Sequence, residues 1–226
     1  MTKLKPKTRR QLRLALGHAA AFLAIWLLWA SPVVYPLKIF VVLLHEISHG
    51  LAAVATGGTI DRILLSPDEG GVTYARGGNA FLILSAGYLG SLAWGLLLLV
   101  AAGARAARVR VIVASLGFFV LGIAIFFVRG WFGWLFALTA SALLLVSARQ
   151  LGPAPLRALL TVVALTSSLY ALLDIRSDIL ARPDARSDAF MLYELTGIHT
   201  LVWGFLWTGI ALMATFLVFR RVFRAA

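Results

Sequence analysis

The sequence predicts an all-α polytopic membrane protein with six or seven transmembrane helices and a small β-hairpin. Of its 226 residues, 61% are hydrophobic and only 13% are charged, and the mean hydropathy is +0.92. A soluble domain is about half apolar and a quarter charged, so this chain lacks the polar surface that water requires. The apolar residues form long blocks of roughly 20, the length that crosses a bilayer core about 30 Å thick as a helix.

The apolar blocks define the expected membrane helices in chain order. They cover residues 14–30, 37–56, 80–102, 109–128, 131–146, 156–173 and 200–219. The first and fifth are short, which leaves a count of six or seven. The first block follows a basic start, as in a signal peptide, but Ala30-Ser31-Pro32 is a poor cleavage site and favours a retained span. We expect one transmembrane domain over residues 14–226, preceded by a basic cytoplasmic tail over residues 1–13.

The net charge of +12 is better explained by contact with lipid headgroups than by binding of nucleic acid. The basic residues lie in the first 13 residues and at the ends of the apolar blocks, where they attract anionic lipid headgroups and set topology. We therefore predict a lipid bilayer as partner, no nucleic acid, and a multi-pass protein of the cell membrane, expected to be a bacterial plasma membrane with the amino terminus in the cytoplasm. The chain has no cysteine, so any metal must be bound by His, Asp or Glu.

Two segments interrupt the apolar pattern. Residues 57–78 contain Ile60, Ile63, Leu65 and Val72 around the turn-forming run 66–71, which predicts a β-hairpin. Residues 174–199 form an acidic loop with a short helix, and this segment holds five of the nine acidic residues: Asp174, Asp178, Asp184, Asp188 and Glu194. With seven spans, both segments would lie on the same face as the amino terminus, whereas Arg105, Arg108, Arg110 and the carboxy-terminal arginines would lie on the opposite face.

The most informative motif is His45-Glu46-Ile47-Ser48-His49, inside the second apolar block. Histidines four residues apart lie on one face of a helix, where both imidazoles reach one ion. Imidazole nitrogen suits Zn²⁺, and Glu46 fits the general base that takes a proton from water and passes it to the leaving amine. Simple packing between helices is the alternative explanation. A charged residue in the middle of a membrane helix costs at least about 2.5 kcal/mol, which favours the metal site.

A catalytic zinc ion has three protein ligands and an open position, so two histidines leave one ligand to be found. A carboxylate is expected, and the acidic segment offers two candidates. Asp174 lies at the end of an apolar block, where an unpaired carboxylate would be costly. Asp188 follows Ser187 at the start of the short helix, which also fits ordinary helix capping. Spacing alone does not choose between them.

These motifs together resemble the site-2 protease family of intramembrane zinc metallopeptidases, and in particular its short bacterial and fungal membrane proteins. The resemblance runs from about residue 39 to residue 207. It rests on the segment 40–50, which reads FVVLLHEISHG, on the hairpin, and on the segment 85–91, which reads SAGYLGS. Ser187-Asp188-Ala189 is similar to the family's Leu-Asp-Gly motif, with alanine in place of glycine. The resemblance implies that Asp188 is the third ligand, with Asp174 as the alternative.

The resemblance also implies cleavage of a transmembrane protein substrate within the membrane, with Zn²⁺ as cofactor and Glu46 as the catalytic residue. Asn79 and Tyr88 are candidates for contact with the substrate backbone. Two other functions remain open: an inactive relative that binds membrane partners, and an ion-coupled transporter. The intact motif argues against the first, and the lack of an internal repeat argues against the second.

Overall fold

The computed structural model describes residues 6–178 and 187–225, and this part of the chain is mainly helical. Its helices are α1 (Pro6–Leu27), α2 (Tyr35–Ala55), α3 (Ala80–Ala102), α4 (Ala106–Phe126), α5 (Trp131–Gln150), α6 (Pro153–Arg176), α7 (Asp188–Thr196) and α8 (Thr200–Ala225). Its strands are β1 (Thr59–Leu65), β2 (Gly71–Arg76) and β3 (Val128–Arg129). The predicted all-α polytopic fold with a small β-hairpin is confirmed.

Six of the described helices are long and apolar enough to cross a membrane: α2, α3, α4, α5, α6 and the Thr200–Val218 part of α8. The apolar stretch of α1, Gln11–Leu27, is shorter than these. Its first turns carry Arg9 and Arg13, which limits the apolar length. The predicted count of six or seven spans thus depends on α1, as its short apolar block indicated.

The hairpin is part of a three-stranded sheet with the order β2-β1-β3. Strands β1 and β2 are antiparallel, and β3 pairs parallel to β1 through Ile63 and Val128, both of which are fully buried. The amide of Ile63 also donates a hydrogen bond of 2.8 Å to the carbonyl of Phe127. Strand β3 was not predicted, because residues 127–128 were assigned to the fourth span and two residues carry no detectable periodicity.

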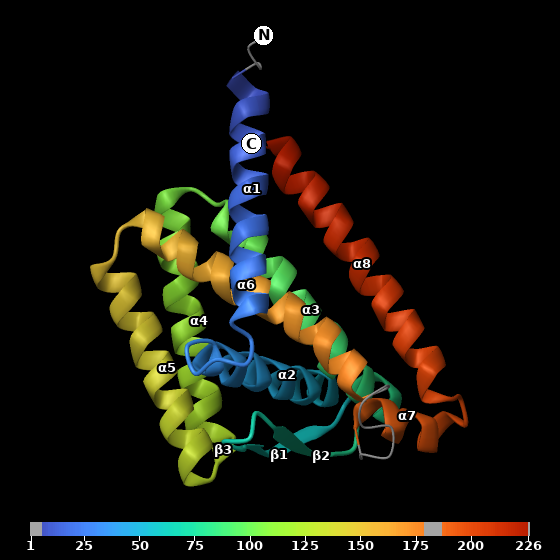
Figure 1. The fold of residues 1–226 in the computed structure, drawn as a ribbon. Helices are drawn as coiled ribbons and strands as arrows, with labels where there is room; N and C mark the ends of the chain where they lie inside the picture. The colour runs from blue at the N-terminus through green and yellow to red at the C-terminus, as the bar shows by residue number, and fades with distance from the viewer. Residues whose placement is uncertain (1–5, 179–186, 226) are drawn as a thin grey trace.

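Helix α2 lies in the centre of the molecule, crosswise to α1, α4 and α5 and next to the sheet (Figure 1). Every residue from Lys38 to Gly50 is buried. A helix that is covered on all sides must be apolar nearly all round, which its sequence satisfies except at the motif and Lys38. The motif is therefore at the core of the fold.

The two ends of the molecule differ in what they contain. The sheet and α7 lie at one end, whereas both chain termini lie toward the other (Figure 1). The hairpin and the described parts of the acidic segment, residues 174–178 and 187–199, share an end, as predicted, and Asp184 lies outside the described residues. The prediction that the amino terminus lies at that same end is wrong, because α2 runs across the molecule instead of returning toward the start of α1. The α3–α4 connection with Arg105 consequently lies with the amino terminus, not opposite to it.

Candidate active site

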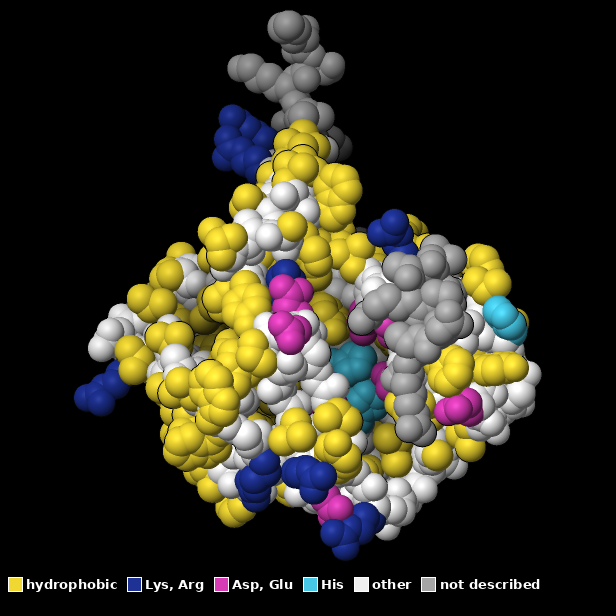
Figure 2. Space-filling model, turned by 60° about the horizontal axis from the view of Figure 1, so that its bottom comes forward, with side chains coloured by type: hydrophobic (Ala, Val, Ile, Leu, Met, Phe, Trp, Pro, Cys, Tyr) yellow, Lys and Arg dark blue, Asp and Glu magenta, His cyan; other side chains and the backbone are white. Residues whose placement is uncertain are grey.

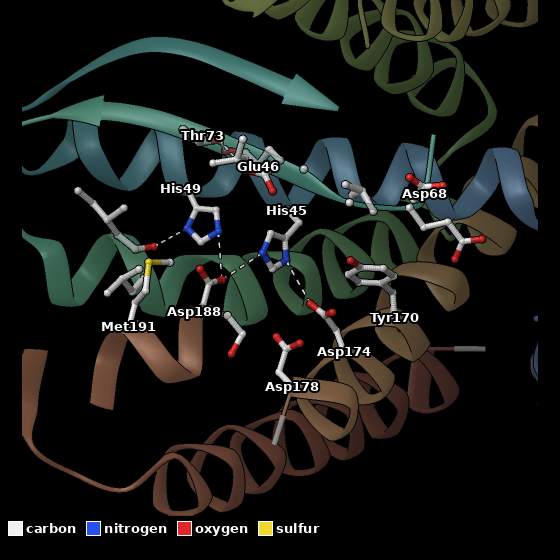
Figure 3. Close-up of a pocket in the computed structure, with 18 residues that line it drawn as sticks. His45, Glu46, His49, Asp68, Thr73, Tyr170, Asp174, Asp178, Asp188 and Met191 are labelled. Carbon is white, nitrogen blue, oxygen red and sulfur yellow. Dashed lines mark hydrogen bonds and ion pairs between the residues drawn. The ribbon is translucent and has the colours of Figure 1, made fainter. Parts of the chain in front are cut away.

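The α2 helix places His45 and His49 one turn apart on the face that looks toward α3 and α7 (Figure 3). Their ring centroids are 4.8 Å apart, and both residues are buried. Gly87 of α3 passes directly against the histidines: a Cβ at this position would lie 2.5 Å from Nε2 of His45. A glycine is thus required for α3 to approach the site this closely.

The hydrogen bonds of the two rings orient them. Nδ1 of His49 lies 2.7 Å from the carbonyl oxygen of Ile83. A carbonyl can only accept, so Nδ1 of His49 carries the proton and Nε2 keeps its lone pair. Nδ1 of His45 lies on the edge of the ring turned away from His49 (Figure 3), and it is 3.3 Å from the hydroxyl of Ser91. Contacts of this kind to the second ring nitrogen are what fix a metal-binding histidine in position.

Asp188 approaches the histidines from the first residue of α7. The hydroxyl of Ser187 accepts a hydrogen bond from the amide of Phe190 and caps this helix, which ends at Gly197 in a left-handed conformation. Oδ2 of Asp188 lies 3.2 Å from Nε2 of His45 and 3.1 Å from Nε2 of His49. Burial alone would raise the pKa of the Asp188 carboxyl, but His45 and His49 in their protonated forms would outweigh burial and hold this pKa below its usual range.

These separations fit a metal ion. Ligand atoms at about 2.0–2.1 Å from a tetrahedral zinc ion lie about 3.3–3.4 Å from one another. The two Nε2–Oδ2 distances of 3.2 and 3.1 Å are close to that value. A ligand atom of Glu46 also lies within 4.8 Å of those of the two histidines. The group is therefore compatible with a metal site made of two imidazoles and a carboxylate.

Asp174, the alternative third ligand, takes a different position. Its Oδ2 lies 3.8 Å from Nδ1 of His45, the nitrogen that also faces Ser91 (Figure 3). It therefore lies beside the ring edge turned away from Asp188. From there a carboxylate can orient the imidazole, in the way that outer carboxylates support metal-binding histidines.

Glu46 is held by the hairpin rather than by the helices. The hydroxyl of Thr73 lies 2.8 Å from Oε2 of Glu46 and 2.8 Å from its carbonyl oxygen. Gly71, two residues earlier on β2, passes so close that a Cβ would lie 2.6 Å from Oε1 of Glu46. The carboxylate of Glu46 thus lies next to the histidines, between α2 and β2 (Figure 3).

A cavity of about 390 Å³ opens in front of these residues. The histidines are visible in a hollow at the sheet end of the molecule, with acidic side chains next to them (Figure 2). Its carboxylates come from α2, the hairpin turn, the end of α6 and the start of α7: Glu46, Asp68, Glu69, Asp174, Asp178 and Asp188. Oε1 of Glu69 forms an ion pair with Nζ of Lys38 at 2.5 Å, and this contact connects the hairpin turn to α2. The motif thus borders a hollow that is lined by acidic side chains.

The two predicted substrate contacts have structural partners. Asn79 caps α3 by accepting a hydrogen bond of 3.1 Å from the amide of Leu82, and it does not line the cavity. Tyr88 is 1% exposed and donates a short hydrogen bond to Asp178. Its ring meets that of His45 edge to face at 5.8 Å. Contact of either residue with substrate stays a prediction.

Sequence reasoning missed several residues of the site. Thr73, Gly71 and the carbonyl of Ile83 contact the motif, yet no local pattern marks them. Ser91 and Gly87 were inside the segment 85–91 on which the resemblance rests, but their individual roles were not inferred. The signal that could have identified Gly87 is its residue type, because a glycine in a membrane helix allows a neighbouring helix to approach closely.

A model of the Peptidase M50B-like family matches residues 18–218. The chain belongs to this family. The resemblance to the site-2 proteases is thereby confirmed over most of the chain, and with it the assignment to a family of intramembrane metalloproteases. Comparisons with curated proteins and with solved structures find no match.

The geometry predicts different effects for the two aspartates. Asp188→Ala removes the carboxylate that faces both Nε2 atoms, and we expect zinc affinity to fall by more than about 100-fold. Asp174→Ala removes a contact to Nδ1 of His45 and leaves the carboxylate that faces both Nε2 atoms in place, so a fall in zinc affinity of about 10- to 100-fold is expected. Chelator competition on the purified proteins measures both, with Asp61→Ala as control, because Asp61 lies on β1 outside the cavity and pairs with Arg76. Loss of zinc from Asp174→Ala with retention in Asp188→Ala would assign the third ligand to Asp174.

Proposed function

We propose that the protein is an intramembrane zinc metalloprotease that hydrolyses peptide bonds of transmembrane proteins. The observation that carries this proposal is the convergence of Nε2 of His45, Nε2 of His49 and Oδ2 of Asp188, with the carboxylate of Glu46 beside them. Family membership supports the same activity.

Zinc bound by His45, His49 and Asp188 would supply a Lewis acid that makes water reactive toward a peptide carbonyl near neutral pH. Each protein group then has a defined task. The hydrogen bond to Ile83 keeps Nε2 of His49 available, and Ser91 with Asp174 orients His45. Glu46 accepts a proton from the attacking water and delivers it to the leaving amine, so one carboxylate serves as base and then as acid.

The substrate must reach this site in an extended form, because the amide groups of a helix are turned inward and bonded to one another. Strand β2 offers a way to bind such a segment. It is an edge strand of the sheet within the described residues, and it passes directly beside Glu46. Addition of a substrate strand to this edge would satisfy the backbone groups of the unwound segment and hold its peptide bond near the motif.

The two other functions receive less support. An inactive relative has no need of a buried Glu46 carboxylate, which is costly to bury and is nevertheless held by Thr73. A transporter needs an ionisable path between the two ends of the molecule. The acidic residues that line the cavity gather only at the sheet end.

The protease proposal predicts that Glu46→Gln keeps the metal and loses the reaction. Without the carboxylate no group takes the proton from water, and the cleavage rate should fall by about 100- to 10,000-fold. The measurement is cleavage of single-span membrane proteins by purified protein in liposomes, together with the zinc content. Glu194→Gln on the exposed face of α7 is the matched control. Cleavage by Glu46→Gln at the wild-type rate would refute the proposal, and ion flux without proteolysis would indicate a transporter.

We further propose that the amino terminus lies in the cytoplasm of a plasma membrane and that the cavity faces the opposite side. The end of the molecule that holds both termini also holds the α3–α4 and α5–α6 connections. Exposed arginines gather there: Arg9, Arg13, Arg105, Arg108, Arg110, Arg149, Arg157 and Arg220. An excess of basic residues marks the cytoplasmic ends of membrane helices.

The orientation can be tested directly because the chain has no cysteine. Glu194→Cys on α7 should react with a membrane-impermeant maleimide in intact bacterial cells. Gln150→Cys at the end of α5 should react only after the cells are permeabilised. The cysteine-free parent gives the background. The reverse pattern would place the cavity on the cytoplasmic side.

A further inference from the structure

Glu46 has a partner that the motif itself does not provide. The Thr73 hydroxyl lies within hydrogen-bond distance of both the carboxylate Oε2 and the backbone carbonyl of Glu46, at 2.8 Å in each case. It thereby connects the side chain of Glu46 to the backbone of the helix that carries it. A glutamate side chain has three rotatable bonds, and this contact restricts them to one arrangement.

Gly71 closes the other side of the same carboxylate. A Cβ on Gly71 would lie 2.6 Å from both Cγ and Oε1 of Glu46, well inside van der Waals contact. Residues 71 and 73 lie on the same face of β2, because successive side chains of a strand alternate. The backbone at Gly71 and the hydroxyl at Thr73 therefore form one surface against which Glu46 rests.

The rest of the sheet fixes where this surface lies. Thr73 is paired with Ile63 of β1, and Ile63 is paired in turn with Val128 of β3. Ile63 and Val128 are fully buried, so the register of β1 is determined by the core. A slip of one residue would turn Thr73 to the opposite face and remove its hydroxyl from Glu46.

We propose that Thr73 is a positioning residue for the general base, and that Gly71 is kept small so that Glu46 fits against β2. This inference rests on the proposed proteolytic function. In this role the hairpin does more than present an edge to the substrate, because it also sets the direction in which the carboxylate of Glu46 points. A carboxylate displaced by about 1 Å is expected to lower the rate about 100-fold without weakening substrate binding.

The test compares Thr73→Val, which keeps the shape and removes the hydroxyl, with Thr73→Ser, which keeps the hydroxyl. For Thr73→Val we expect kcat to fall by about 10- to 100-fold, with KM and zinc content unchanged. Thr73→Ser should recover most of the activity. Thr59→Val, at the exposed start of β1, is the matched control and should match wild type. A merely structural role would raise KM or reduce zinc content, and serine would not specifically restore kcat.

Gly71→Ala tests the second half of the proposal. The added methyl group must displace the Glu46 carboxylate, so kcat should fall with zinc retained. Gly122→Ala in α4 is the control for the glycine-to-alanine change, because a Cβ there meets no atom within 4 Å. Wild-type kcat in both Thr73→Val and Gly71→Ala would overturn the inference.

Glu46→Gln in the same assay separates this inference from the proposed function. If Glu46→Gln is inactive while Thr73→Val is fully active, the protease function stands and the role of Thr73 is refuted. If Glu46→Gln is fully active, the proposed function itself fails, and the positioning role fails with it.

Discussion

Two histidines from one helix and one aspartate from another must lie close enough together to bind a single metal ion. Much of the fold follows from this requirement. Asp188 contacts both Nε2 atoms only because α7 packs next to α3 and because α3 has no side chain at Gly87. A methyl group there would overlap both His45 and Asp188. Burying these groups without a common partner would cost several kcal/mol. The site is therefore stable only as a complete set.

The supporting contacts come from parts of the chain that are far apart. The carbonyl of Ile83 and the hydroxyl of Ser91, both on α3, orient the rings, and Asp174 from α6 lies behind His45. Thr73 from the hairpin holds Glu46. The helices supply the groups proposed to bind the metal, whereas the sheet supplies the position of the proposed base. This division explains why a mainly helical membrane protein contains a three-stranded sheet.

Prediction from sequence succeeded where a physical pattern is local. Apolar blocks of membrane length gave the helices, and the spacing of His45 and His49 placed both rings on one face of α2. The capping residue Ser187 indicated the start of the short helix α7. It failed where the decisive contact is between distant segments: the pairing of β3 with β1, the crosswise course of α2, and the hydroxyl of Thr73 beside Glu46. A two-residue strand and a single threonine leave no periodic trace in the sequence, and span counting assumes that every apolar helix crosses the membrane.

Two imidazoles and a carboxylate are proposed to bind one zinc ion inside this bundle. Zinc K-edge X-ray absorption on the purified, zinc-loaded protein tests it most directly. We expect one zinc per chain, with the multiple-scattering signature of two imidazoles and with oxygen as the remaining ligands, at about 2.0–2.1 Å. A spectrum without imidazole ligands, or a protein that retains no stoichiometric zinc, would contradict it.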